Sequence, residues 1–439
     1  MNMLRNTPSP EEGFWLPFTA MRAFHDAPIL FERAEGMHYI TPDGRRVLDM
    51  MAGLWCVNAG HAHPRVTEAI REAAGKLDFV SSFRMSHPAA FTFARRLLDA
   101  VPMMGRAFFS NSGSEAVDTA LKIARAYHRA RGDAGRVKFI GRAKSYHGVG
   151  FGGLSVGGIA RHKKEFGPLL ADVFHMPLPH DPAQTFLTGR PAENPRWMAA
   201  LEEILFVQDP STVAAIIVEP VTGSGGVYPP PQGYLEGLRA ICDRHGILLI
   251  FDEVITGFGR LGACTASEAL GVTPDIMTMA KGLTNGAVPM GATLVTQAVF
   301  DAFMAHPRGA PEFMHGYTYS AHPLACAAGM ATLDAYQQEG MFEASARIAG
   351  PFRDALLALR GAPHVVDVRT CGLLAAVDLG ARPGAPGARG AEVADHCLAA
   401  GVLVRAAGDM MVLSPPLVVT EDQVAQTVAA LRAALAATA

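Results

Sequence analysis

The stretch ILLIFDE, residues 247–253, decides the fold, because five apolar residues run directly into two acids. A short apolar run of this kind is typical of a strand that is buried on both faces of a parallel sheet. In such sheets the working residues lie just past the carboxyl ends of the strands. A buried acid needs a partner, so Asp252 is a candidate for holding a proton on a heteroaromatic nitrogen. The alternative is an acid that caps a helix or forms an ion pair.

Similar apolar runs precede and follow this stretch and alternate with helical patterns. They are RAFFS (106–110), VKFIG (137–141), AAIIVEP (214–220), DIMTMA (275–280) and GATLV (291–295), with a helical pattern at 114–130. The alternation predicts βαβ units, hence an α/β fold with a mostly parallel sheet covered on both faces. We expect one large domain over residues 66–329.

The pattern changes after residue 330. Two pairs of strands are predicted within 364–380 and 402–416, and helices within 391–401 and 421–437. A hairpin with its turn at Asp43-Gly44 is predicted near the N-terminus, and we expect it to pack with the C-terminal part. The sequence therefore predicts a smaller α+β domain built from residues 1–65 and 330–439. Residues 380–390 read as a surface loop.

Composition excludes several classes of protein. The chain of 439 residues is 49% hydrophobic and 18% charged with a net charge of −3, which is typical of a globular protein. It has no basic tract of five residues and no run of 18 apolar residues, so neither nucleic acid nor membrane is expected as a partner. The six cysteines are scattered and residues 1–15 lack the apolar core of a signal peptide, which indicates free thiols and a cytoplasmic location. His61 and His63 lack further nearby ligands, and we expect no metal site.

Three further segments carry chemistry. In SNSGSEA (110–116), Gly113 and Ser114 open a helix whose free N–H groups suit a phosphate, although Ser112 could simply be a helix cap. In TMAKGLTNG (278–286), a lysine in a partly apolar site has a lowered pKa and can act as a Schiff-base nucleophile or general base. The alternative for Lys281 is a side chain that reaches water. Gly282 is expected to leave room for a cofactor beside this lysine.

The segment KSYHGVGFGG (144–153) supplies an aromatic ring, Tyr146, that can stack on a planar cofactor. Its GVGFGG matches a dinucleotide fingerprint, but we reject that function because four residues intervene after the strand and no convincing helix follows. A phosphate cradle, an acid for a ring nitrogen, a stacking ring and a Schiff-base lysine together fit pyridoxal 5′-phosphate (PLP). Val254 is small enough to lie flat against the ring of that cofactor.

Three segments resemble the class III, fold type I aminotransferases: residues 251–262, 274–295 and 315–329. The segments around Trp55 and Arg405 resemble the ω-amino acid:pyruvate branch, which includes the β-alanine:pyruvate transaminases. The resemblance implies a large domain with a mostly parallel seven-stranded sheet and a smaller α+β domain. It also implies PLP as cofactor and a homodimer with a shared active site; a tetramer is left open.

Carried over by position, the resemblance implies the following roles. Lys281 forms the Schiff base and Asp252 pairs with the pyridine nitrogen. The other cofactor-binding residues that it implies are Gly113, Ser114, Tyr146, His147, Glu219 and Val254, with Thr318 reaching the phosphate from the neighbouring subunit. The family usually has glycine where this chain has Ala321, and a positive φ there would strain the alanine.

Arg405 is the expected partner of a substrate carboxylate, because a guanidinium matches a carboxylate with two hydrogen bonds. We expect it to swing away when an apolar amine binds; the alternative is a strand-end surface arginine. Trp55 is expected to wall the substrate pocket together with Phe18, Phe83 and Ser224, and plain core packing is the alternative for these four.

The predicted activity is therefore transfer of an amino group from an ω-amino acid or primary amine to pyruvate. Two other functions remain open: a PLP-dependent aminomutase or epimerase, and a PLP-binding regulator, for which no spare partner domain is evident. Within the aminotransferase prediction, the donor could instead be taurine, γ-aminobutyrate or a monoamine such as 1-phenylethylamine.

Overall fold

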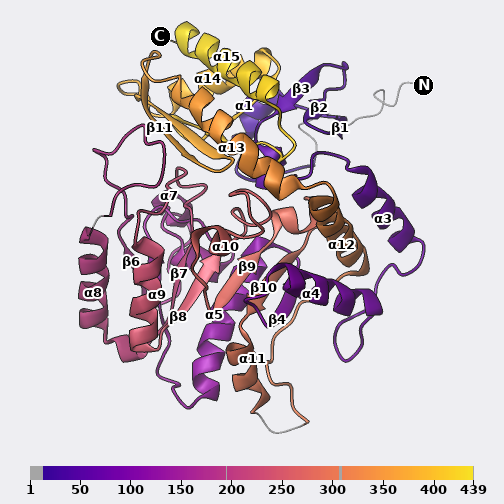
Figure 1. Cartoon of the computed structure of the whole chain (residues 1–439), viewed down its shortest axis with the longest axis vertical. Coiled ribbons are helices and arrows are strands. Elements are labelled where there is room, and N and C mark those ends of the chain that lie inside the picture. Colours follow the sequence, from indigo (N-terminus) through magenta and orange to yellow (C-terminus); the bar gives the residue numbers. More distant parts are fainter. Residues whose placement is uncertain (1–12, 194, 306–308, 439) are drawn as a thin grey trace.

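A seven-stranded sheet forms the lower half of the molecule in Figure 1, a computed structural model that describes residues 13–193, 195–305 and 309–438. The strand order is β4-β10-β9-β8-β7-β5-β6, in which β10 is antiparallel to both neighbours and every other pair is parallel. The strands are β4 (Arg106–Ser110), β10 (Gly291–Val295), β9 (Ile276–Met279), β8 (Leu248–Asp252), β7 (Val213–Val218), β5 (Lys138–Arg142) and β6 (Val173–Met176). The α/β fold with a mostly parallel sheet is confirmed.

Helices cover both faces of this sheet. Successive side chains of a strand point to opposite faces, and in this sheet the apolar side chains of both faces need to be buried. Ala215 and Ile217 of β7 pack with α5 (Gly113–Ala130) and α11 (Gln297–Met304). Ile216 and Val218 pack on the other face with α8 (Arg196–Gln208) and α9 (Tyr234–His245), which lie side by side in Figure 1. Every residue of β7 is buried, which explains why its sequence is an unbroken apolar run.

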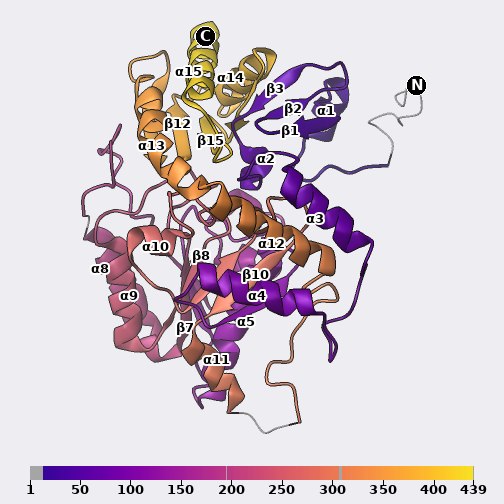
Figure 2. The ribbon, with the colours of Figure 1, turned by 45° about the vertical axis from the view of Figure 1, so that its right-hand side comes forward.

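A further group of helices packs beside the edge of the sheet that carries β4. The long helix α12 (Pro323–Gln338) contacts α3 (Pro64–Ala74) and α4 (Pro88–Ala100), as Figure 2 shows. Phe93 of α4 stacks on Phe109 of β4 with 5.3 Å between ring centroids. Proline occupies the first turn of each of these three helices, where its missing N–H costs nothing.

Two four-stranded sheets lie above the large one. The first has the order β1-β2-β3-β13 and the second the order β11-β12-β15-β14. The strands are β1 (Arg33–Glu35), β2 (His38–Ile40), β3 (Arg46–Asp49), β11 (Val365–Cys371), β12 (Leu374–Leu379), β13 (Val402–Leu403), β14 (Arg405–Ala406) and β15 (Met410–Leu413). β2 and β3 form the predicted hairpin, and the pairing of β13 with β3 confirms that it packs with the C-terminal part. The domain boundaries at 65 and 330 stay a prediction.

The remaining helices are short or flank the small sheets. They are α1 (Met21–Asp26), α2 (Ala52–Trp55), α6 (Phe151–Val156), α7 (Ala160–Lys163), α10 (Ala266–Leu270), α13 (Met341–Leu357), α14 (Ala388–Ala399) and α15 (Glu421–Ala437), with 3₁₀ turns η2 (Pro210–Thr212) and η3 (Lys281–Thr284). No helix among the described residues is long and apolar enough to cross a membrane.

Four local predictions were wrong. A short helix, α6, does follow the GVGFGG segment, and α14 begins inside the predicted loop at 380–390. The strand β6 was missed because it is a four-residue edge strand that is only partly buried. The predicted strand pair at 402–416 is three strands, because the chain leaves one small sheet after β13 and joins the other at β14.

The described residues also include all six cysteines, which are free thiols; Cys56 and Cys371 are partly buried and the other four fully buried. No group of three or more His, Cys, Asp or Glu that could hold a metal ion occurs in the described ranges. His61 contacts Asp49 at 2.7 Å and His63 contacts Glu339 at 3.1 Å, so the two histidines have separate partners. The signal-peptide prediction rests largely on residues 1–12, which lie outside the described part of the chain.

Candidate active site

Five chain segments meet at the carboxyl edge of the large sheet. Asp252 is the last residue of β8, and Lys281 follows β9 by two positions. Glu219 follows β7, and Tyr146 and His147 lie in the loop after β5. The start of α5 reaches the same edge because β4 and β9 are both antiparallel to β10.

Asp252 is held in one orientation by three hydrogen bonds. Its Oδ2 lies 2.8 Å from Nδ1 of His147, and its Oδ1 accepts from the Thr278 hydroxyl at 3.0 Å and from the Val254 N–H at 3.1 Å. Asp252 and His147 are both buried. Buried carboxylates cost free energy unless they are hydrogen-bonded, and these contacts supply that compensation.

Glu219 forms a second buried acid beside the first. Its carboxylate accepts from the Tyr146 N–H at 3.1 Å and from the Gly223 N–H at 2.9 Å. Burial raises the pKa of Glu219, while the nearby His147 and Arg142 favour its ionised form. Glu219 therefore links the Tyr146 loop to the loop that follows β7.

Lys281 begins the η3 turn with a left-handed backbone, at a φ of 51°. Burial lowers the pKa of its amine, and the charges of Asp252 and Glu219 oppose that shift. The Nζ atom has no hydrogen-bond or ion-pair partner in the described part of the chain. A lysine in this state has an increased fraction of neutral, nucleophilic amine.

The start of α5 offers an anion site. Ser112 caps the helix by accepting the Glu115 N–H at 3.2 Å, so the capping alternative holds for Ser112 itself. The N–H groups of Gly113 and Ser114 have no partner among the described residues and lie at the positive end of an 18-residue helix. A Cβ on Gly113 would approach the Val254 side chain to 3.0 Å, so glycine allows Val254 to lie against the helix start.

Gly282 does not leave room for a cofactor, contrary to the prediction. A Cβ at this position would lie 2.7 Å from the Asn58 amide and 3.1 Å from Phe258. The glycine therefore allows close packing behind the lysine, away from the site. Asn58 accepts there from the buried Arg260, at 2.6 Å, and donates to the Phe258 carbonyl at 2.7 Å.

The expected pocket walls are only partly assembled. Trp55 is buried and its ring would lie 3.2 Å from a Cβ on Gly223, next to Ser224, which is partly buried. Phe18 lies 5.5 Å from the His162 ring, and that ring lies 5.7 Å from the ring of Tyr146.

Phe83 and Thr318 form a separate exposed group. Phe83 keeps 54% of its surface exposed and is adjacent to Gly316, and Thr318 is also exposed. No interaction between described residues brings Phe83 or Thr318 to Lys281.

Arg405 of β14 is partly buried and its guanidinium has no hydrogen bond or ion pair with any described residue. Burial and the positive charge of Arg161 lower the pKa of Arg405, and Tyr146 opposes the shift. The same two arginines, after burial, lower the pKa of His162. Arg161, His162 and Arg405 are thus a group of basic side chains beside Tyr146 that forms no ion pair with an acid in the described ranges, which suits a substrate carboxylate.

Comparison with known proteins decides the family. A model of the family described as "Aminotransferase class-III" matches residues 20–435. The chain is a class III aminotransferase. It is 52% identical to an omega-aminotransferase of Caulobacter vibrioides over 97% of each chain, and 44% identical to a beta-alanine–pyruvate aminotransferase of Pseudomonas aeruginosa over 91% of this chain and 90% of the other.

Solved transaminase structures have the same fold. An amine transaminase from an uncultivated Pseudomonas species, in its PLP-bound form, superposes with a TM-score of 0.90 at 39% identity, covering 98% of this chain and 100% of that one. An omega transaminase of Pseudomonas jessenii, in complex with PMP, superposes with a TM-score of 0.92 at 33% identity, over 97% and 96% of the two chains. The chain has the fold type I of PLP-dependent transferases, as predicted, and PLP is its cofactor.

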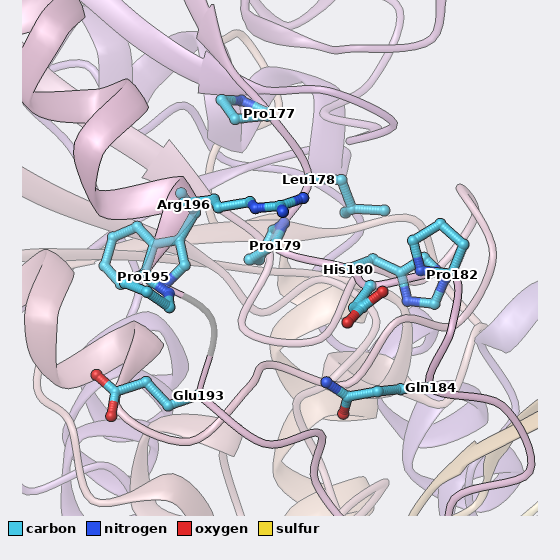
Figure 3. A pocket seen from close by; sticks show the side chains of 11 residues that line it. Pro177, Leu178, Pro179, His180, Pro182, Gln184, Glu193, Pro195 and Arg196 are labelled. Atoms are coloured by element: carbon cyan, nitrogen blue, oxygen red, sulfur yellow. The ribbon is translucent and has the colours of Figure 1, made fainter.

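The residues at the sheet edge fit that cofactor in charge and space. The unpaired N–H groups of Gly113 and Ser114 suit a phosphate, the fixed carboxylate of Asp252 suits a protonated ring nitrogen, and the unpaired amine of Lys281 suits an aldehyde. The Asp252 carboxylate is fixed by three hydrogen bonds, whereas the Lys281 amine and the two helix N–H groups have no partner among the described residues. A cavity of about 470 Å³ between Pro177 and Trp197, shown in Figure 3, contains none of these residues and is not this site.

Sequence reasoning on this aminotransferase missed three residues of the site. Thr278 was visible as the one hydroxyl in the apolar run before Lys281, and strand alternation places it near Asp252. Arg161 and His162 lie in a short helix without an amphipathic pattern, and nothing in their own segment signals a pocket.

Proposed function

We propose that this class III aminotransferase transfers an amino group from an ω-amino acid such as β-alanine, or from a primary amine, to pyruvate. The products are a semialdehyde or ketone and alanine. The observation that carries the proposal is the unpaired basic group around Arg405 beside Tyr146, because both β-alanine and pyruvate present a carboxylate. The names of the Caulobacter and Pseudomonas relatives support it.

The cofactor residues have distinct roles in this proposal. Lys281 would hold PLP through its amine, Asp252 would pair with the ring nitrogen, and Gly113 and Ser114 would donate to the phosphate. Tyr146 and Val254 would pack against the ring. His147 and Thr278 act on Asp252 and keep its carboxylate aimed, and Glu219 fixes the backbone at Tyr146.

PLP supplies an electron sink for the electron pair that is left when the Cα–H bond of the donor breaks. The protein supplies the base. Once the donor amine has displaced it from the cofactor, the Lys281 amine would take the proton from the donor Cα and deliver it to C4′ of the cofactor, which requires an uncharged Nζ. Burial favours that form, as the lowered pKa of Lys281 indicates. The Asp252 carboxylate, held in place by its three hydrogen bonds, would oppose loss of the ring proton.

Arg405 binds the substrate carboxylate in this proposal, and Arg161 adds positive charge at the same end of the pocket. The strand β14 has only two residues and Arg405 is its first. The unpaired guanidinium is free to move aside for an apolar donor. Trp55, Ser224 and Phe18 form the remaining walls and limit bulk beside the reacting carbon.

The active unit is proposed to be a homodimer located in the cytoplasm. Thr318 and Phe83 then reach the site of the partner subunit, which accounts for their exposure in the single chain. Pairing of dimers into a tetramer remains compatible with this proposal.

A donor panel with pyruvate as acceptor tests the substrate assignment. β-Alanine, taurine, γ-aminobutyrate and 1-phenylethylamine are each mixed with the holoenzyme, and loss of the cofactor absorbance and formation of alanine are measured. We expect β-alanine to bleach the cofactor and to yield alanine. Bleaching with no alanine, and return of the amino group to the same molecule, would indicate an aminomutase. If no ω-amino acid or amine bleaches the cofactor, the substrate assignment is wrong.

A further inference from the structure

The loop at 222–228 forms one side of the site. It is closed by two backbone hydrogen bonds between Thr222 and Tyr228, at 3.1 and 3.0 Å. Its Gly223 N–H donates to Glu219 at 2.9 Å, and the same glycine faces the ring of Trp55. Ser224, an expected pocket wall, follows directly. The position of this loop therefore sets one side of the substrate pocket.

Arg369 of β11 binds this loop through hydrogen bonds to its backbone. The guanidinium is buried and donates through Nε and Nη2 to the Gly226 carbonyl, at 3.0 and 2.9 Å. The same guanidinium lies over the ring of Tyr228, 4.4 Å from its centroid. Lys144 approaches that ring as well and contacts its hydroxyl at 2.7 Å.

Two carboxylates fix the guanidinium in turn. Asp378 of β12 accepts two hydrogen bonds from it, at 2.7 and 2.9 Å, and Asp367 accepts a third at 2.7 Å. A guanidinium that two carboxylates bind has little freedom to move. The Gly226 carbonyl is therefore fixed relative to the strands β11 and β12 that carry those carboxylates. A lysine could not bind Gly226 and both acids in the same geometry.

The strands that anchor Arg369 also lead to Arg405. The order β11-β12-β15-β14 places Asp378 opposite Met410 of β15, and Val412 of β15 opposite Arg405. The side chain of Met410 lies 3.6 Å from the Arg369 guanidinium. One rigid sheet thus carries the proposed carboxylate partner and holds the loop with Ser224.

We propose that Arg369 is a positioning residue that fixes the 222–228 loop relative to Arg405 and thereby sets the span between the reacting carbon and the substrate carboxylate. The inference rests on the proposed function for its substrate, and on the hydrogen bonds of Arg369 for its geometry. The loop needs this restraint because Gly226 and Val227 have φ values of 141° and 46°, conformations that persist only when surrounding contacts hold them.

The test compares Arg369→Met and Arg369→Lys with Arg136→Met in the holoenzyme. Arg136 is a matched control because its guanidinium also holds backbone carbonyls, in this case three, at the amino ends of the strands of the large sheet and away from the site. Amide hydrogen exchange of residues 222–228 is followed by mass spectrometry. We expect exchange to rise about tenfold or more in both Arg369 variants and to stay unchanged in the Arg136 variant.

Single-turnover bleaching is then measured with β-alanine and with 1-phenylethylamine, which lacks a carboxylate. We expect kcat/KM for β-alanine to fall about 10- to 100-fold in Arg369→Met, mainly through KM, and that for the amine to fall less than about threefold. If Arg369→Met does not fold, Arg369→Lys decides, with the same directions expected.

The positioning role would be overturned if amide exchange of the loop were unchanged, or if the ratio of kcat/KM for β-alanine to that for 1-phenylethylamine were unchanged. A wild-type enzyme that bleaches with neither donor would instead refute the proposed function. The exchange measurement still tests the Arg369 contacts in that case, so the two failures are distinguishable.

Discussion

At the scale of single residues, the site depends on a lysine and two acids that the fold keeps out of full hydration. Asp252 and Glu219 each accept at least two hydrogen bonds, whereas the amine of Lys281 has none in the described part of the chain. Without cofactor, this lysine raises the free energy of the folded state, because burial penalises its charged form. Such destabilised groups are characteristic of functional sites.

Lys281→Met removes the reactive amine and, with it, the free-energy cost of burying a charged lysine. We expect transamination to fall about 10³-fold or more, because the base and the attachment point are lost together. We also expect the apoprotein to be more stable than wild type at pH 7. The folded pKa of Lys281 lies below its unfolded value, so the unfolded chain binds more protons between the two values, and wild-type stability rises with pH across that window. Urea unfolding of the apoproteins from pH 7 to 10 measures both effects.

In Lys281→Met this rise of the free energy of unfolding with pH should be missing. The free energies of unfolding of the two proteins should therefore converge as the pH approaches the ordinary lysine pKa of about 10.4. Lys76→Met serves as the control, because Lys76 is exposed just after α3. A Lys281→Met apoprotein that is less stable than wild type at pH 7 would contradict the burial argument. Near wild-type activity would contradict the catalytic role.

The positions of Asp252 at the end of an apolar strand and of Lys281 just beyond another were predictable from the sequence, and their roles stay a prediction. The sequence does not predict their partners. His147 lies 105 positions before Asp252 and joins it only through the parallel arrangement of β5, β7 and β8. Arg369 and Gly226 are separated by 143 positions, and Gly226 lies in a loop outside the sheet that contains Arg369. Such pairs depend on the topology, which no local pattern contains.

At the scale of elements, the turns after the strands carry unusual backbone conformations. Lys281 opens η3 at a positive φ, and Ala321 has a φ of 56° just before α12. The condition under which alanine would be strained at this position, a positive φ, is thus met. The alanine is also buried within the main apolar core, where its methyl group packs.

Ala321→Gly restores the glycine that is usual in the family, and its three energetic effects nearly cancel. Relief of the left-handed conformation stabilises by about 1–2 kcal/mol. Loss of a buried methyl group costs about 0.8 kcal/mol. The greater freedom of glycine in the unfolded chain costs about 0.4–1 kcal/mol. We expect the free energy of unfolding to change by less than about 1 kcal/mol and activity to be unchanged, as urea unfolding and the β-alanine assay would measure.

Ala328→Gly is the matched control, because Ala328 is buried in the middle of α12 and gains no backbone relief. It should destabilise by about 1–2 kcal/mol. If Ala321→Gly lowered the free energy of unfolding as much as Ala328→Gly does, the left-handed backbone at residue 321 would carry no strain.

Elements were predictable where burial is complete and less so elsewhere. The strands β7, β8 and β9 are buried at every residue, and their apolar runs locate them within one or two positions. The edge strand β6 and the two-residue strands β13 and β14 are defined by which neighbour they pair with. Arg405 lies in one of these, so its sheet could not be inferred from its segment.

At the scale of the whole molecule, large apolar side chains are exposed around the segment that precedes α12. Met314 and Tyr319 are 82% and 57% exposed, and Phe83 lies beside Gly316. Exposed apolar patches of this kind mark interaction surfaces in soluble proteins. Thr318 lies among these residues, which is the arrangement expected if a second copy covers them and receives this threonine at its phosphate.

Complementation between two inactive variants tests this arrangement. The first variant, Lys281→Ala, lacks the reactive amine. The second, Thr318→Asp, places a negative charge where it would repel the phosphate. Each homodimer should be nearly inactive. If Thr318 acts across the interface, a heterodimer purified through two different tags has one site with both native residues and one site with neither. It should show about half of the wild-type rate per dimer. If Thr318 acts within its own chain, each site of the heterodimer has one defect and activity stays absent. A fully active Thr318→Asp homodimer would remove Thr318 from the phosphate site altogether.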